Sequence, residues 1–382
     1  MRRVFFLCCC FVCSAVFGQG NEAPVTVSPA TAVLMEQARS ITASLDDNTL
    51  AAQLLLTSID GRSSLPSSMK NLLERIPAGG IMFFRYNLDS SKEDAKKLLS
   101  EAAEAVSINA GIPPFMAVDH EGGLVHRFGP GVERLPSAYS FWQLAQREGR
   151  AASLARAETL YRRSAEEIRE LGINLVLAPL AETLNNENRV FLETRSYGPD
   201  HDFTEEAALV FIKSMDASGI AATLKHFPGN SAVDPHYGVA SLDLDKKQLD
   251  EMVKPFAGII DRIDVPFVML SHVKLPALDG RHASLSRTVI QDWLRGELGF
   301  EGIVLADDYS MGAVSASGQR LGATVVEALN AGVDMIMVWP RDLSAVHAFI
   351  LEAVREGRLS RERLRDAATR IIAVKLRYFF SP

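Results

Sequence analysis

The feature that most constrains the fold of this chain is a regular alternation of short apolar runs with longer amphipathic stretches. The runs are continuously apolar, as expected of parallel strands that have helices on one face and packed side chains on the other. We place eight of them, at Gln53–Thr57, Gly80–Phe84, Phe115–Val118, Asn174–Ala178, Ile220–Leu224, Phe267–Ser271, Gly302–Ala306 and Val333–Val338. Between them, apolar residues recur at helical steps of three and four, for example from Leu154 to Ile168 before Gly172.

Eight strand–helix units in one chain predict a single (β/α)8 barrel, the TIM-type fold of the α/β class. A last helix is expected over about Arg361 to Leu376. With 382 residues the chain could also form two average domains, but no second linker or low-complexity tract interrupts it. We therefore interpret residues 32–382 as one barrel domain.

The first residues have the pattern of an export signal. Arg2 and Arg3 precede the apolar run Val4 to Phe17, which predicts a signal peptide over residues 1–19. Residues 20–31 are polar and contain proline, so they are interpreted as a linker. We expect an exported protein, periplasmic or secreted.

All four cysteines, Cys8, Cys9, Cys10 and Cys13, lie within this signal. The mature protein would contain none, which excludes a disulfide scaffold and thiolate chemistry from it. The apolar run is too short for a membrane-spanning helix. A lipid anchor on Cys13 remains the alternative to a soluble form.

The formal net charge of −7 argues against a nucleic-acid partner and leaves small or neutral substrates open. We expect a monomer.

Ionisable residues gather at the carboxyl ends of the predicted strands, where TIM-type barrels carry their chemistry. Every strand from the third to the seventh is followed by at least one of them: Asp119, Glu121, Arg195, Lys225, His226, His272, Asp307 and Asp308. Strand positions and polar residues, identified independently, therefore converge on one rim.

The segment LKHFPGNSAVDPH, residues 224–236, is the richest part of this rim. Asp234 and His236 are separated only by a proline, so the carboxylate can lie close to the imidazole. A nearby negative charge favours the protonated ring, and such a pair can donate a proton near neutral pH. The alternative is a loop in which the two residues only bond each other and the backbone.

Asp307 directly follows the seventh apolar run, in the sequence ADDYSMG. A carboxylate at the end of a rigid strand is well placed to act as a nucleophile or to stabilise a positively charged transition state. The alternative is that one aspartate caps the next helix, and we expect Asp308 to do so.

Two further rim segments allow either a binding or a structural reading. In DHEGG and the residues after it, Asp119 and Arg127 could hold sugar hydroxyls, while Glu121 is expected to pair with Arg127. Arg195 lies in the sequence ETRSYG; loop arginines are more often solvated, and only its place after the fourth strand favours binding.

Together these motifs resemble glycoside hydrolase family 3, within it the single-domain β-N-acetylglucosaminidases of the NagZ type. The resemblance covers about Asn48 to Phe380. The motifs that carry it are GGIMFF, VDHEGG, RSYG, KHFPG with the later Asp-Pro-His, SLSRTVI, LRGELGFEGIVLADDYSMGA and NAGVDMIMV.

The resemblance implies a retaining exo-acting enzyme that releases terminal GlcNAc from peptidoglycan fragments or chitooligosaccharides, without a metal or an organic cofactor. It implies Asp307 as the nucleophile and His236, oriented by Asp234, as the acid/base residue. It implies substrate contacts for the rim residues Asp119, Arg127, Arg195, Lys225 and His226.

The chain departs from the family pattern at several rim positions. Asn230-Ser231 replaces the usual His-Gly, and the loop before Asp234 is two residues shorter. The other departures are His120 for Gln, Leu124 for Arg and Ala306 for Ser or Thr. An altered substrate preference, or a sugar-binding protein with weakened catalysis, therefore remains open.

Two further enzyme classes are weighed against this reading. A β-glucosidase or β-xylosidase of the same family is disfavoured by the Asp-His pair, because such relatives usually take their acid from another domain. A metal-dependent hydrolase using Asp119, His120, His226 and His272 lacks the usual ligand spacing.

Overall fold

Eight parallel strands close into a barrel in the order β1 to β8, which confirms the predicted fold. The computed structural model describes residues 29–234, 238–309 and 320–379. The strands are β1 Leu55–Ser58, β2 Gly80–Phe83, β3 Phe115–Val118, β4 Leu175–Val176, β5 Ala221–Phe227, β6 Phe267–Leu270, β7 Ile303–Ala306 and β8 Met335–Val338. Each overlaps the apolar run that predicted it.

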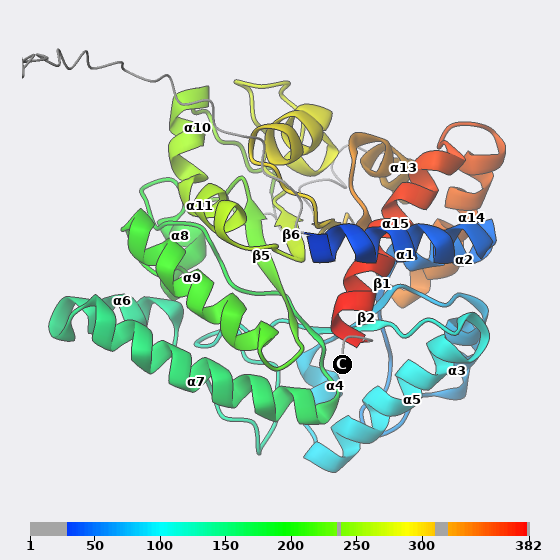
Figure 1. Cartoon of the computed structure of the whole chain (residues 1–382), viewed down its shortest axis with the longest axis horizontal. Coiled ribbons are helices and arrows are strands. Elements are labelled where there is room, and N and C mark those ends of the chain that lie inside the picture. The colour runs from blue at the N-terminus through cyan, green and yellow to red at the C-terminus, as the bar shows by residue number, and fades with distance from the viewer. Residues whose placement is uncertain (1–28, 235–237, 310–319, 380–382) are drawn as a thin grey trace, which may run out of the picture.

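Helices surround the barrel on the outside (Figure 1). They are α1 Pro29–Ser44, α2 Asp47–Gln53, α3 Ser67–Arg75, α4 Arg85–Leu88, α5 Lys92–Ala110, α6 Ala138–Glu148, α7 Arg150–Leu171, α8 Arg189–Leu192, α9 His201–Asp216, α10 Lys246–Met252, α11 Lys254–Arg262, α13 Leu321–Ala331, α14 Pro340–Arg355 and α15 Arg361–Phe379. Shorter or irregular helical segments are η1 Glu193–Arg195, η2 Ala283–Leu285 and the π-type η3 Thr288–Glu297.

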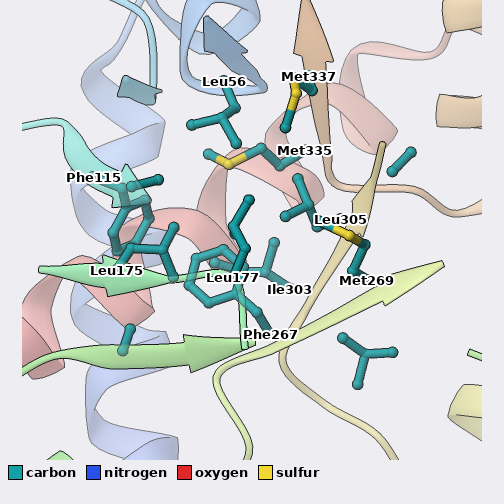
Figure 2. Packing of buried hydrophobic residues seen from close by; sticks show 14 of the residues in the cluster. Leu56, Phe115, Leu175, Leu177, Phe267, Met269, Ile303, Leu305, Met335 and Met337 are labelled. Atoms are coloured by element: carbon teal, nitrogen blue, oxygen red, sulfur yellow. The ribbon is translucent and has the colours of Figure 1, made fainter. Parts of the chain in front are cut away.

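Side chains from alternate strand positions fill the barrel (Figure 2). The labelled residues, all buried, are Leu56, Phe115, Leu175, Leu177, Phe267, Met269, Ile303, Leu305, Met335 and Met337. If the paired residues are followed from β1 through each neighbouring strand and back to β1, the path returns eight residues away from its starting residue. This displacement is the shear number of a TIM barrel. The interior is therefore a packed core, and chemistry is confined to its ends.

The sequence prediction of β5 was too short. It ended the strand at Leu224, whereas β5 continues to Phe227 and so includes Lys225 and His226. Lys225 lines the cavity at the barrel end and pairs with Asp119 and Glu121, which follow β3. The apolar pattern ended the predicted strand at this charged residue, although the strand continues through it. The pairing with β6 shifts its register between Lys225 and Phe227.

The two ends of the described chain meet on one side of the barrel. Helix α1 lies beside α15, where Ala38 packs against Ile372 and Ala373 (Figure 1). Helix α1 begins at Pro29, within the range 20–31 expected to be a linker; residues 20–28 of that range and the expected signal peptide lie outside the described residues. No helix in the described ranges is apolar over a length that could cross a bilayer.

Candidate active site

A cavity of about 310 Å³ lies at the carboxyl end of the barrel. It brings together six of the eight predicted site residues: Asp119, Arg127, Arg195, Lys225, His226 and Asp307. Met82, Met269 and Met337, from β2, β6 and β8, also line it. Polar groups thus stand above an apolar layer, the usual composition of a small-molecule site.

The remaining two predicted residues belong to the segment after β5. Asp234 is partly exposed and is not among the cavity-lining residues of the described chain. His236 lies outside the described residues. The proton-donor role expected of this pair therefore stays a prediction.

One wall of the cavity is a buried ion cluster centred on Lys225. Its Nζ lies 2.7 Å from Glu121 Oε1 and 3.2 Å from Asp119 Oδ1. Arg195 binds Glu121 through two hydrogen bonds, of 2.8 Å from Nε and 2.9 Å from a terminal nitrogen. Arg127 lies 3.2 Å from Asp119 Oδ2. The pairing expected between Glu121 and Arg127 is therefore wrong, since Glu121 instead joins Arg195 to Lys225.

The cluster keeps its carboxylates ionised. Burial alone would raise the pKa of Asp119, but Lys225 and Arg127 outweigh burial and hold that pKa below its usual range. In the same way, Lys225 and Arg195 hold the pKa of Glu121 far below its usual range despite burial. Arg127, Arg195 and Lys225 are thus each paired with a carboxylate at the cavity wall.

Asp307 stands on the opposite side, one residue beyond β7. Its Oδ1 accepts a hydrogen bond of 2.8 Å from the backbone N–H of Asp308. The indole Nε1 of Trp339, one residue beyond β8, donates to Asp308 Oδ2. Asp307 faces the cavity, and Asp308 is held beside it by Trp339. The helix expected to be capped by Asp308 falls on residues 310–319, outside the described part of the chain.

His272, beyond β6, lines the cavity near Asp307. Its Nδ1 and the Ser284 hydroxyl are 2.8 Å apart. Burial lowers the pKa of His272 to about 4, although the Asp307 charge raises it, so the imidazole is neutral near pH 7.

The sequence reasoning did not identify Glu182, Trp339 or Phe84. Glu182 is buried and binds His226 Nδ1 at 2.6 Å. The Phe84 ring stacks on Trp339 with centroids 5.3 Å apart. Glu182 and Trp339 each follow an apolar stretch of the sequence, and Phe84 ends the second predicted run, so their positions near strand ends were the signal that could have found them.

Among the described residues, no group of three or more His, Asp or Glu side chains is arranged to hold a metal ion.

Comparison with known proteins gives a consistent picture. The model of the glycosyl hydrolase family 3 N-terminal domain matches residues 48–374. A beta-hexosaminidase of Stenotrophomonas maltophilia is 34% identical over 304 residues, which cover 77% of this chain and 86% of the relative.

Two solved structures are similar along most of the chain. One is a glycoside hydrolase family 3 beta-N-acetylglucosaminidase from Paenibacillus sp., with a TM-score of 0.81 and 30% identity over 88% of this chain. The chain spans only 63% of that longer protein. The other is NagZ from Neisseria gonorrhoeae in complex with N-trifluoroacetyl-D-glucosamine, with a TM-score of 0.72, 26% identity, and coverage of 84% of this chain and 89% of that one.

Proposed function

The chain belongs to glycosyl hydrolase family 3, and from this premise we propose that it is a retaining exo-β-N-acetylglucosaminidase. Its substrates would be carbohydrates with terminal β-linked GlcNAc, such as peptidoglycan fragments or chitooligosaccharides. The observation that carries the proposal is the position of Asp307, which lines a cavity whose opposite wall is the Lys225 ion cluster.

The proposed reaction has two displacements. The Asp307 carboxylate attacks the anomeric carbon and forms a glycosyl-enzyme, while an acid protonates the departing glycosidic oxygen. The same group, now a base, then removes a proton from water, which attacks the anomeric carbon and releases Asp307. We assign the acid/base role to His236, oriented by Asp234, on the sequence pattern.

Substrate contacts are assigned to Asp119, Arg127, Arg195, Lys225 and His226. All five line the cavity, and four of them are fixed by the ion cluster. Charged donors held rigidly can bind sugar hydroxyls without reorganising when the transition state forms.

The exported location and the monomeric state stay part of the proposal. The N-terminal pattern supports processing to a periplasmic or secreted form, with a lipid anchor on Cys13 as the alternative.

The test is hydrolysis of a chromogenic GlcNAc β-glycoside by the purified chain. Asp307→Asn should reduce kcat by several orders of magnitude, as loss of a covalent nucleophile does in other hydrolases. A fluorinated mechanism-based glycoside should label Asp307.

No turnover above the Asp307→Asn background would contradict the proposal, and measurable GlcNAc binding in that case would favour a sugar-binding protein. Faster cleavage of the matching glucoside would favour a β-glucosidase.

A further inference from the structure

Glu182 is a buried carboxylate shared by two parts of the chain near the cavity. Its side chain is 1% exposed. Oε1 accepts hydrogen bonds from His226 Nδ1 at 2.6 Å and from the His226 backbone N–H at 3.2 Å. Asn230 donates its backbone N–H to Oε2 at 2.7 Å and its side-chain amide to Oε1 at 2.9 Å. Four donors thus meet one carboxylate.

These bonds fix the state of the His226 ring. Because a carboxylate only accepts hydrogen bonds, the proton on this side of the ring must be on Nδ1. Nε2 is then the ring nitrogen left for a ligand, and His226 lines the cavity. A change at Glu182 would remove the bonds that fix the tautomer and direction of His226.

The same carboxylate also holds the start of the segment that leads to Asp234. Asn230 is buried, whereas Asp234 is partly exposed, so the segment runs from the interior to the surface within a few residues. Asn230 is also a position at which this chain departs from the family pattern, and here its amide contributes one of the four bonds. Glu182 therefore links the sugar-facing imidazole to the base of the shortened loop.

We propose that Glu182 is a positioning residue that aligns His226 with the sugar and fixes the segment from Asn230 to Asp234, and with it acid catalysis. This inference rests on the proposed function. The bonds to His226 and to Asn230 share one side chain, so a single substitution should impair both substrate binding and proton donation.

The experiment compares two substrates in the full chain carrying Glu182→Gln. The 2,4-dinitrophenyl β-glycoside of GlcNAc loses its leaving group without a proton, whereas N,N′-diacetylchitobiose needs one. Gln keeps the shape of Glu182 but presents an NH₂ group towards one of the donors. We expect KM to rise for both substrates, and kcat/KM to fall at least about tenfold more for the disaccharide, a part of the 10²–10⁴ that acid–base catalysis is typically worth.

Glu167→Gln is the matched control. Glu167 accepts the backbone N–H of Glu133 at 2.8 Å on the outer helix α7, and it does not line the cavity. It should leave the ratio between the two substrates unchanged. If Glu182→Gln does not fold, as judged by circular dichroism, Asn230→Ala removes one of the four bonds and should change the ratio in the same direction.

An equal loss for both substrates, or no loss, would overturn the inference while leaving the proposed function intact. A wild-type chain that hydrolyses neither substrate would instead overturn the proposed function, and this inference with it.

Discussion

Three histidines near the carboxyl end of the barrel differ in the hydrogen-bond partners of their rings. His226 binds a buried carboxylate, whereas His120 and His272 meet the hydroxyls of Ser164 and Ser284. Burial, with a smaller contribution from His126, lowers the pKa of His120 to about 3. Among the described residues no carboxylate hydrogen-bonds to either ring, so burial has the largest effect on both pKa values and both rings remain neutral at physiological pH.

This neutrality predicts a loss of stability in acid. Below pH 6.5 the unfolded chain takes up a proton at His120 that the folded protein does not take up until about pH 3, so the free energy of unfolding falls as the pH falls through this window. His120→Gln removes the titrating ring. Between pH 7 and pH 4.5, the wild type should lose about 2 kcal/mol more than this variant, measured by urea denaturation. Equal losses would show that His120 is protonated in the fold.

At the scale of the element, the alternation of side chains between the two faces of a strand continues past the end of the strand. Ile303 and Leu305 face the interior of the barrel (Figure 2). Asp307, two residues beyond Leu305, lines the cavity. In β8, Met335 and Met337 likewise face the interior of the barrel. Trp339, two residues beyond Met337, lines the cavity. A strand on a rigid barrel therefore directs the residue beyond its end, so the orientation of Asp307 towards the cavity follows from the register of β7.

The same register makes a glycine necessary in β2. Gly80 pairs with Leu56 and Phe115, two large inward-facing residues. A Cβ at Gly80 would lie 2.7 Å from Leu56 Cδ1 and 3.2 Å from Phe115 Cβ. Gly80→Ala should reduce the free energy of unfolding by about 1–3 kcal/mol through overpacking, measured by chemical denaturation. Gly111→Asn is the control: Gly111 ends α5 in open space with φ of +65°, where Asn is tolerated, and the cost should be smaller.

At the scale of the whole molecule, α15 brings a lysine against the barrel end opposite the cavity. Lys375 is 1% exposed; its Nζ donates to Gln53 Oε1 at 2.7 Å and lies 5.3 Å from the centre of the Phe115 ring. Burial holds the pKa of Lys375 well below its usual range. Helix α15 therefore buries the amine of Lys375, a group that can gain or lose a proton.

The consequence is a rise of stability with pH on the alkaline side. Between the lowered pKa and about 10.4 the unfolded chain binds a proton that folded Lys375 does not, so the free energy of unfolding increases as pH rises. Lys375→Met should flatten this dependence between pH 7 and pH 9.5, measured by denaturant titration. Lys70→Met, at a half-exposed lysine, should not. A slope unchanged in Lys375→Met would mean that the amine stays protonated in the fold.

The order and type of the strands could be predicted from the sequence because they depend on local patterning. Continuous apolar runs identified all eight strands, and their ends identified the rim on which Asp119, Arg195, Lys225 and Asp307 meet. Boundaries were less predictable where a charged residue such as Lys225 is buried within a strand and paired with a carboxylate from a distant segment.

Only the tertiary structure decided which charges pair. Glu121 binds Arg195, 74 residues away, instead of nearby Arg127, and Asp119 binds Lys225 across 106 residues. Glu182 likewise binds His226, which lies 44 residues away. The sequence by itself determined the barrel and the ring of chemistry at its carboxyl end, because strand period and strand ends are properties of neighbouring residues. Partner choice within that ring depends on distances between side chains in space, which only the closed barrel sets.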